Sequence, residues 1–243
     1  MSFSSNKKFI SGEDFKLSRS KLELFLQCRR CFYLDRRLNI AQPASAPFTL
    51  NSAVDFLLKK EFDIYRQKKE PHPLMKKHKI KAIPFWHPEI DEWRNNFKGI
   101  SFYHSPTKII LQGAIDDVWQ NERGELIIVD YKATSINGEV SLDSSWKESY
   151  KRQIEIYQWL FKMNGFNVSR MGYFVYANGK KDVAGFGEKL EFDVRILPYE
   201  GNSFWVEEAL FEARKCLEDE KIPPFNEKCP FCLYSQKIKE IEN

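Results

Sequence analysis

Gly113-Ala114-Ile115-Asp116 and Asp130-Tyr131-Lys132 are the two stretches of sequence that decide the fold. Between them, Asn121-Glu122-Arg123-Gly124 is typical of a tight turn. The segments on either side, 109–119 and 125–133, are rich in branched and aromatic residues, as strands usually are. The sequence therefore predicts an antiparallel hairpin in which Asp116 stands about opposite Asp130, with their Cβ atoms about 4.5–5.5 Å apart.

The second strand of this hairpin carries its charges at the end of an apolar run. Residues 126–129 are apolar on both faces, which is typical of a strand buried on both sides. Asp130 and Lys132 follow on one face, because side chains alternate along a strand. Two close carboxylates repel each other unless a cation lies between them, and buried charges need a partner or a metal. The pattern favours a site that holds a divalent cation against a phosphodiester over an ordinary hairpin with a solvated, charged face.

The rest of the chain predicts helices and strands around the hairpin. A helix over 150–163 places Gln153 and Tyr157 one turn apart, and strand–helix–strand order predicts that a strand over 171–176 runs parallel to 125–132. Ser20 and Glu23 form the pattern of a capping box. The remaining predicted elements are helices over 20–35, 50–65 and 206–217 and a strand over 190–196.

The order of these motifs resembles the PD-(D/E)XK nuclease superfamily. G-x-x-D, D-x-K and Q-x-x-x-Y occur here as 113–116, 130–132 and 153–157. Within the superfamily the chain is most similar to the RecB-type exonuclease domain and the related CRISPR-adaptation nucleases. Residues 20–28 resemble the N-terminal helix of that group and 229–232 its cysteine-bearing tail.

Three features depart from the family pattern. No proline precedes Asp116, although RecB-type members commonly show G-x-x-D instead. Asp55, at the end of 51–55, stands where many members have a helical histidine. The tail has two cysteines, whereas the iron–sulfur members usually have three.

The resemblance implies an α/β fold with a restriction-endonuclease-like core, in which helices flank a mixed central β-sheet. It implies a metal-dependent deoxyribonuclease, an exonuclease rather than an endonuclease, that acts in DNA repair, recombination or defence. DNA is then the expected partner, with a helicase or another repair or defence protein as a further one. A non-catalytic nucleic-acid-binding protein and a nuclease acting on RNA are the alternatives; a lysine beside two carboxylates argues against the first.

The resemblance also assigns roles to the residues of the predicted site. Asp116, Asp130 and the carbonyl of Tyr131 are expected to ligate Mg²⁺ or Mn²⁺, which take oxygen ligands. Lys132 is expected to orient or activate the attacking water and to stabilise charge on the phosphate. Gln153 and Tyr157 are expected to contact substrate and brace the site. Simple packing is the alternative for the pair, and for Tyr157 taken alone packing is favoured. Asp55 is either a third carboxylate near the metal or a solvated helix residue.

Two C-x-x-C pairs lie at opposite ends of the sequence, Cys28/Cys31 and Cys229/Cys232. Four thiolates suit a zinc ion or an iron–sulfur cluster. The spacing alone favours zinc, whereas the resemblance favours a four-iron–four-sulfur cluster, which we expect here with zinc as the alternative. Free buried thiols are the alternative, and Cys216, in helical sequence, is expected to be an ordinary core or surface residue.

Length and composition predict one domain over 1–243, since 243 residues with 42% hydrophobic content can bury one sizeable core. The sequence shows neither an apolar run near 18 residues nor the pattern of a signal peptide, so we expect a cytoplasmic protein without a membrane partner. The net charge of +4 is mild. Residues 66–81 hold seven basic residues and one acidic residue, which predicts a connector that either binds phosphates non-specifically or is merely solvated.

Overall fold

The computed structural model describes residues 8–44, 46, 48–144 and 147–242. The chain divides into two compact units. We call residues 47–100 and 113–203 the central unit, and residues 1–46, 101–112 and 204–243 the terminal unit. The assignment of 1–243 to one domain stays a prediction.

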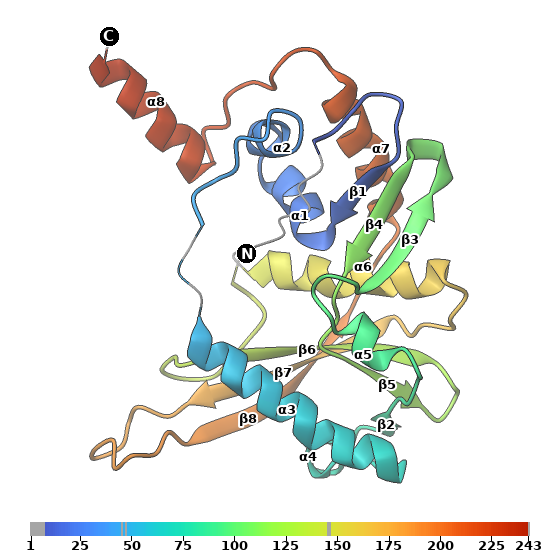
Figure 1. The fold of residues 1–243 in the computed structure, drawn as a ribbon. Helices are drawn as coiled ribbons and strands as arrows, with labels where there is room; N and C mark the ends of the chain where they lie inside the picture. Colours follow the sequence, from blue (N-terminus) through green and yellow to red (C-terminus); the bar gives the residue numbers. More distant parts are fainter. Residues whose placement is uncertain (1–7, 45, 47, 145–146, 243) are drawn as a thin grey trace. The chain divides into compact units, whose positions relative to one another are not determined.

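The central unit is built on a five-stranded sheet in the order β2-β5-β6-β7-β8 (Figure 1). Strands β6 and β7 are parallel, as the sequence predicts, and the other neighbours are antiparallel. The sheet is therefore mixed, and the predicted α/β fold class is confirmed. The strands are β2 (Ala82–Pro84), β5 (Asp117–Asn121), β6 (Leu126–Thr134), β7 (Met171–Gly179) and β8 (Phe192–Glu200). The helices of this unit are α3 (Thr49–Lys68), α4 (Pro73–Lys77), α5 (Ile90–Trp93) and α6 (Glu148–Met163).

Two helices cover the two faces of this sheet (Figure 1). Helix α3 buries Leu58 and Phe62 in a core that includes Trp119, Val129 and other side chains of the same face. Helix α6 lies against the other face, where a Cβ added at Gly172 would meet Ile154 Cγ2 at 2.7 Å. Burial of each large apolar side chain stabilises the fold by roughly 1.5–3 kcal/mol. Packing on the two faces of the sheet thus fixes the positions of α3 and α6. Strand β6 of this sheet carries Asp130 and Lys132.

The predicted hairpin is present between β5 and β6. The side-chain oxygen of Asn121 accepts hydrogen bonds from the N–H groups of Arg123 (2.9 Å) and Glu125 (3.0 Å), and Gly124 has φ 76°, a conformation that glycine adopts without strain. The single strand predicted over 109–119 is wrong, because the chain leaves the ladder at 114–116. There the N–H of Ile115 donates to the carbonyl of Trp93 at 3.0 Å.

The terminal unit contains a three-stranded sheet in the order β1-β4-β3, with β1 and β4 parallel. Its strands are β1 (Phe15–Ser18), β3 (Ile100–His104) and β4 (Ile109–Gly113). Its helices are α1 (Arg19–Gln27), α2 (Arg29–Arg36), α7 (Trp205–Glu218) and α8 (Pro230–Glu242). Helices α1 and α2 pack against each other and against α7.

The one helix predicted over 20–35 is two helices, broken at Cys28, whose backbone is extended. The predicted capping box is also wrong. Ser18 caps α1, its Oγ accepting the N–H of Lys21 at 3.3 Å, while Glu23 accepts from the side chain of Gln27 at 3.0 Å. Ser18 and Ser20 are both suitable N-cap residues. The helix begins after Ser18 because β1 ends there.

The basic segment over 66–81 is more structured than a connector. Its first residues end α3 and its middle forms α4, and Arg66 is buried with 3% of its surface exposed. Lys76, Lys77 and Lys79 are exposed.

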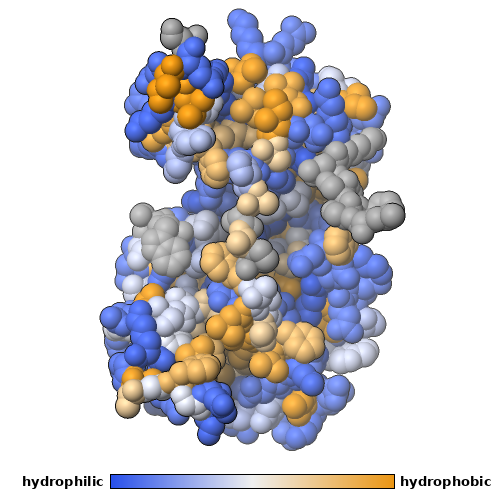
Figure 2. Space-filling view, turned by 60° about the vertical axis from the view of Figure 1, so that its left-hand side comes forward, coloured by the Kyte–Doolittle hydropathy of each residue, from blue (hydrophilic) through white to orange (hydrophobic). Residues whose placement is uncertain are grey.

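The surface carries both kinds of side chain. Figure 2 shows hydrophobic groups gathered at several places among hydrophilic ones, and the exposed large apolar residues include Leu57, Trp86 and Phe97. None of the described helices combines the length and the hydropathy that a membrane-spanning segment needs.

Candidate active site and cysteine centre

Asp116 and Asp130 approach each other where the hairpin begins. Asp117 pairs with Val129 in the ladder, and the register carried one residue further sets Asp116 opposite Asp130. Asp130 is 1% exposed and forms an ion pair with Lys132, two residues along the same strand face. The ammonium of Lys132 also lies 4.5 Å from the ring centroid of Tyr150 on α6. Two carboxylates and a lysine therefore share one end of the sheet.

Asp116 is held by three contacts from different elements. Its Oδ2 accepts the backbone N–H of Tyr131 at 2.9 Å, and its Oδ1 accepts from Lys59 on α3 at 3.1 Å. Its backbone carbonyl accepts from Nε of Arg94 at 3.0 Å. Burial opposes ionisation of Asp116, but the nearby Lys59 and Lys132 ammonium groups lower its pKa below the ordinary value. The side chain is thus fixed and negatively charged.

Asp130 differs from Asp116 in its surroundings. Burial raises the pKa of Asp130 to about 7, and the Asp116 carboxylate adds to this, although Lys132 acts in the opposite direction. Among the described residues, neither Oδ1 nor Oδ2 of Asp130 has a hydrogen-bond partner of ordinary geometry. A buried carboxylate of this kind is costly. A divalent cation held with Asp116 would add to the compensation that Lys132 gives, so the donor set fits such an ion.

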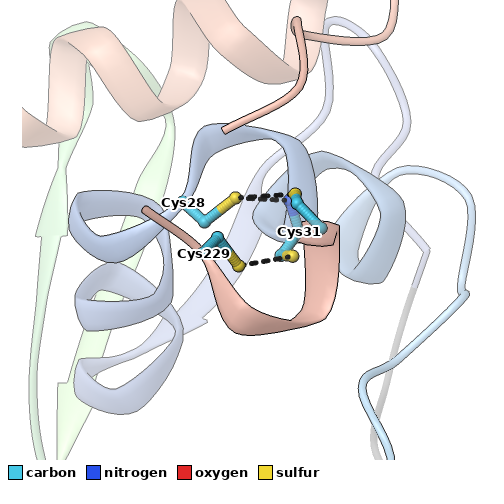
Figure 3. Close-up of side chains that lie close together, drawn as sticks. Cys28, Cys31 and Cys229 are labelled. Carbon is cyan, nitrogen blue, oxygen red and sulfur yellow. Dashed lines mark hydrogen bonds between the residues drawn. The ribbon is translucent and has the colours of Figure 1, made fainter. Parts of the chain in front are cut away.

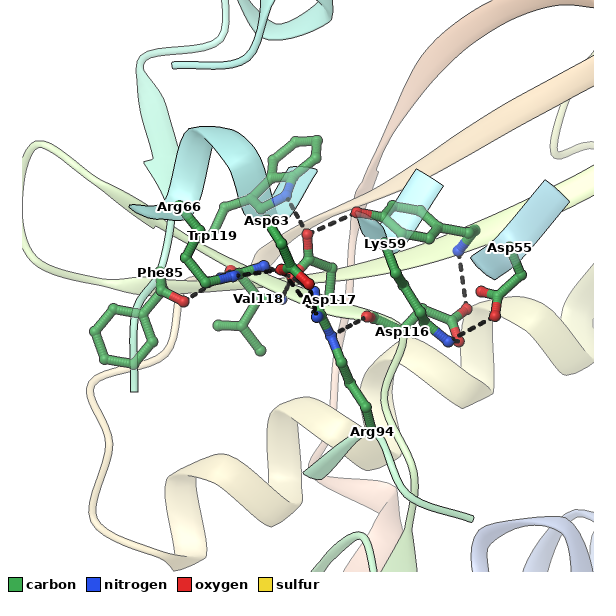
Figure 4. Close-up of polar contacts among 11 residues, drawn as sticks. Asp55, Lys59, Asp63, Arg66, Phe85, Arg94, Asp116, Asp117, Val118 and Trp119 are labelled. Carbon is green, nitrogen blue, oxygen red and sulfur yellow. Dashed lines mark hydrogen bonds and ion pairs between the residues drawn. The ribbon is translucent and has the colours of Figure 1, made fainter. Parts of the chain in front are cut away.

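Asp55 and Lys59 complete the cluster from α3 (Figure 4). Lys59 Nζ lies 2.8 Å from Oδ2 of Asp55, and its pKa is raised because the Asp116 and Asp55 carboxylates outweigh the effect of burial. Burial and the Asp116 charge raise the pKa of Asp55. The structure therefore brings Asp55 close to the predicted site, together with Lys59, which the sequence did not single out.

A second network centres on Asp117, whose side chain is fully buried (Figure 4). Its Oδ1 pairs with Arg66 and with Nη2 of Arg94 at 2.9 Å, and its Oδ2 accepts from the hydroxyl of Tyr131 at 2.6 Å and from the indole of Trp119 at 3.2 Å. The two guanidinium groups overcome burial and lower the pKa of Asp117. Since Arg94 and Tyr131 also bond to Asp116, this network sets the position of the candidate ligand.

Sequence reasoning missed the Asp117 network. The available signal was the pair of consecutive aspartates, Asp116 and Asp117, at the start of an otherwise apolar strand. The two arginines that neutralise Asp117 are 51 and 23 residues away in the sequence, so their pairing with it is a property of the fold.

The two predicted helical residues behave differently. The hydroxyl of Tyr157 donates a hydrogen bond to the carbonyl of Ala114, and Tyr157 is 3% exposed. Tyr157 therefore braces the segment that leads to Asp116. Gln153 is half-buried one turn earlier on α6, and the described contacts tie it to none of the three carboxylates. Substrate contact by either residue stays a prediction, as does the Tyr131 carbonyl as a metal ligand.

The four cysteines of the two C-x-x-C pairs meet in the terminal unit (Figure 3). All are buried, and their Sγ atoms lie within 4.8 Å of one another. The Sγ separations are 3.6 Å for Cys28–Cys232 and for Cys31–Cys229, much longer than a disulfide of about 2.05 Å. Among the described residues, these four cysteines are the one set of three or more His, Cys, Asp or Glu side chains whose ligand atoms lie close enough together to hold a metal ion.

Both pairs begin at the start of a helix. Cys28 caps α2, its Sγ accepting the N–H of Cys31 at 3.4 Å, and Cys229 directly precedes α8. Burial opposes the Cys229 thiolate, but hydrogen bonds from the N–H groups of Cys232 and Phe231 and from neighbouring thiols lower its pKa. Burial raises the pKa of Cys31. Helix N-termini favour thiolates, the form that binds metal.

One comparison with known proteins identifies a family. A family model described as the PD-(D/E)XK nuclease superfamily matches residues 49–236. No curated protein matches the chain. Among the solved structures that it resembles is one titled "Crystal structure of SSO0001", at 16% identity over 93% of this chain and 87% of that chain, with a TM-score of 0.46. That likeness is too distant to say anything about function.

Proposed function

Because this chain belongs to the PD-(D/E)XK nuclease superfamily, we propose that it is a Mg²⁺- or Mn²⁺-dependent nuclease that hydrolyses DNA phosphodiester bonds at Asp116, Asp130 and Lys132. Membership itself indicates a hydrolytic nuclease. The observation that carries the assignment of the site is Asp130, a buried carboxylate that lies beside a second carboxylate and the ammonium of Lys132 and whose pKa burial raises to about 7.

Each residue of the site has a distinct role in this proposal. Asp116 and Asp130 hold the cation, with the Tyr131 carbonyl as a third oxygen, and Asp55 adds negative charge nearby. When bound, the cation polarises the phosphate and lowers the pKa of an attacking water. Lys132 orients that water and stabilises the charge that develops on the phosphate oxygens. Its position is restrained by Asp130 and by the ring of Tyr150.

DNA as substrate and exonuclease action are supported by the resemblance to RecB-type domains. Two features of the central unit suit a nucleic acid of either kind. Lys76, Lys77 and Lys79 are exposed and can contact phosphates. Trp86 and Phe97 are 60% and 81% exposed, and exposed rings can stack on unpaired bases. A helicase or another repair or defence protein stays a predicted partner.

We further propose that Cys28, Cys31, Cys229 and Cys232 hold a structural metal. A single tetrahedral zinc with Zn–S bonds of about 2.3 Å places its sulfurs about 3.8 Å apart, close to the separations found here. A four-iron–four-sulfur cluster, which the resemblance favours, binds each thiolate to a different iron and needs the sulfurs further apart. The geometry therefore favours zinc, with the cluster as the alternative.

One experiment tests the proposed activity directly. The protein is incubated with end-labelled single- and double-stranded DNA and with RNA of the same sequence, in Mg²⁺, in Mn²⁺ and in chelator. We expect metal-dependent loss of DNA, with products that shorten progressively from an end. Cleavage of RNA alone would reassign the substrate, and binding without cleavage under every condition would identify a non-catalytic nucleic-acid-binding protein.

A further inference from the structure

Lys59 lies between two carboxylates of the candidate active site. Its Nζ is 2.8 Å from Oδ2 of Asp55 and 3.1 Å from Oδ1 of Asp116 (Figure 4). The lysine side chain is 20% exposed, so its ammonium is partly withdrawn from solvent. One monovalent cation thus already bridges two of the three acidic groups that could bind a metal.

The fold imposes this position on Lys59. Asp55 and Lys59 are four residues apart on α3, a spacing that places them on the same helix face. Leu58 and Phe62 of the same helix are buried in the core, which fixes the rotation of α3 about its axis. The contact with Asp116, 57 residues away in sequence, therefore follows from the packing of α3 and not from a free surface side chain.

We propose that Lys59 takes the place of a second divalent cation and limits the active site to one metal ion. This inference rests on the proposed function, because it takes Asp116 and Asp130 to be ligands. Two-metal sites hold their ions about 3.5–4 Å apart and share a carboxylate between them. Asp116 is the residue able to be shared here, because Asp130 stands opposite it in the hairpin and Lys59 links it to Asp55. The ammonium of Lys59 fills the Asp55 side.

Two further observations support the assignment. One oxygen of Asp55, Oδ1, is buried and has no hydrogen-bond partner among the described residues, so a metal-ligand oxygen is available on that side. The net charge of the cluster also favours competition between Lys59 and a second metal ion. Counted as ionised, the three carboxylates and the two lysines of the cluster carry one net negative charge, which becomes two when Lys59 is replaced by a neutral residue.

The test counts bound metal ions without measuring cleavage. Mn²⁺ is titrated into the full chain, and binding is followed by calorimetry and by electron paramagnetic resonance, in which two neighbouring Mn²⁺ ions show spin coupling. The wild-type protein is expected to bind one Mn²⁺ that Asp130→Asn removes. Lys59→Met is expected to bind two coupled ions, the first at least about tenfold more tightly, because a competing charge about 3 Å away is gone. Lys59→Arg keeps the charge and is expected to bind one.

Two controls make the result specific. Lys60→Met removes the same charge from the next, exposed residue of α3 and is expected to leave the count at one. Lys59→Met combined with Asp55→Asn is expected to return the count to one, because the second ion loses its ligand. Lys59→Gln repeats the main experiment if the Met variant folds poorly, as judged by circular dichroism.

The outcomes separate the two proposals. A wild-type protein that binds no Mn²⁺ sensitive to Asp130→Asn contradicts the proposed function itself. A single ion in the wild type and also in both Lys59→Met and Lys59→Gln leaves the proposed function standing and overturns the role of Lys59. That role is equally overturned if the double variant with Asp55→Asn still binds two ions.

Discussion

The backbone N–H of Tyr131 donates a hydrogen bond of 2.9 Å to Oδ2 of Asp116, so the residue after one proposed ligand holds the other. Its hydroxyl reaches the neighbouring aspartate, Asp117, at 2.6 Å. Tyr131 thus binds two consecutive aspartates through two different atoms, one at the candidate site and one in the buried network beneath it. The separation of these two roles can be tested by substitution.

Tyr131→Phe removes the contact to Asp117 and keeps the contact to Asp116. Because a buried carboxylate oxygen loses a donor, we expect the free energy of unfolding to fall by about 1–3 kcal/mol, with a much smaller effect on cleavage. Denaturant unfolding at pH 7 measures the first and a nuclease assay the second. Tyr173→Phe, which removes a hydroxyl from the next strand, is the matched control. A large fall in the cleavage rate of Tyr131→Phe under conditions where the variant stays folded would mean that the Asp117 contact also governs the site.

Asp130→Asn and Lys132→Ala are each expected to lower the cleavage rate at least about 10²–10³-fold, because one removes a metal ligand and the other the group that stabilises charge on the phosphate. The fold and the affinity for DNA are expected to change little. Single-turnover cleavage and fluorescence anisotropy measure the two effects. Lys151→Ala, which breaks an exposed pair with Glu148 on α6, is the control. Cleavage at the wild-type rate by either variant would place the catalytic site elsewhere.

Replacing Lys76, Lys77 and Lys79 with serine is expected to weaken DNA binding and to reduce its salt dependence by up to about three counterions. The affinity measured at several salt concentrations gives the slope. Serine replacement of Lys180, Lys181 and Lys189, which are also exposed in the central unit, changes the net charge equally. Equal slopes for the two triple variants would show that only net charge matters and that residues 66–81 are a solvated surface.

Each of the four Cys→Ala changes at residues 28, 31, 229 and 232 is expected to lower solubility and the melting temperature, whereas Cys216→Ala is not. The loop closed by Cys28 and Cys232 spans 204 residues, and cross-linking so long a loop stabilises by on the order of 4–5 kcal/mol. Metal analysis and an absorption spectrum identify the centre. Colourless protein with one zinc indicates the tetrahedral site, and broad absorption near roughly 400 nm with iron and sulfide indicates a cluster. Anaerobically purified protein with neither metal and five free thiols would rule out both.

The surroundings of His72 lead us to expect that the stability of the protein depends on pH. Its Nδ1 accepts the N–H of Leu74 at 3.1 Å, its Nε2 lies 3.0 Å from Glu61, and its ring stacks on Phe62 at 4.0 Å. Burial lowers the pKa of His72, although Glu61 opposes this. The unfolded chain therefore takes up a proton first as the pH falls, so stability present at neutral pH is lost below about 6.5.

His72→Asn keeps a side-chain acceptor at the start of α4 but does not titrate. We expect the difference in unfolding free energy between wild type and this variant to shrink as the pH falls from 8 to 5, measured by urea unfolding at each pH. A constant difference across that range would show that His72 does not titrate differently in the folded and unfolded states.

Local patterns in the sequence were sufficient to predict the hairpin and the site at its open end. The turn at 121–124 sets the register that pairs Asp117 with Val129, and the contacts of Asp116 with Tyr131 and Lys59 hold it beside Asp130. The convergence of the four cysteines was also predictable, because two short pairs need a common partner. The metal that they hold and the catalytic roles of the site residues stay predictions.

Other features depended on contacts distant in sequence. The strand predicted over 109–119 breaks because Ile115 bonds to Trp93, and nothing in the composition of the segment signals it. Arg66 looked like one of several basic residues, yet it is buried against Asp117. Lys59 stands four residues after Asp55 in the sequence, and only the packing of α3 directs it to Asp116.

The pairing of Cys28 and Cys31 with Cys229 and Cys232 has a consequence for the timing of biosynthesis. A ribosome completes the first pair about two hundred residues before the second. All strands of the central unit have been translated by Glu200, so its sheet can form on the nascent chain, whereas the cysteine centre can assemble only after residue 232 has emerged. Incorporation of the proposed metal can therefore only follow synthesis of residue 232, and a chain truncated before Cys229 retains the whole candidate active site without the centre.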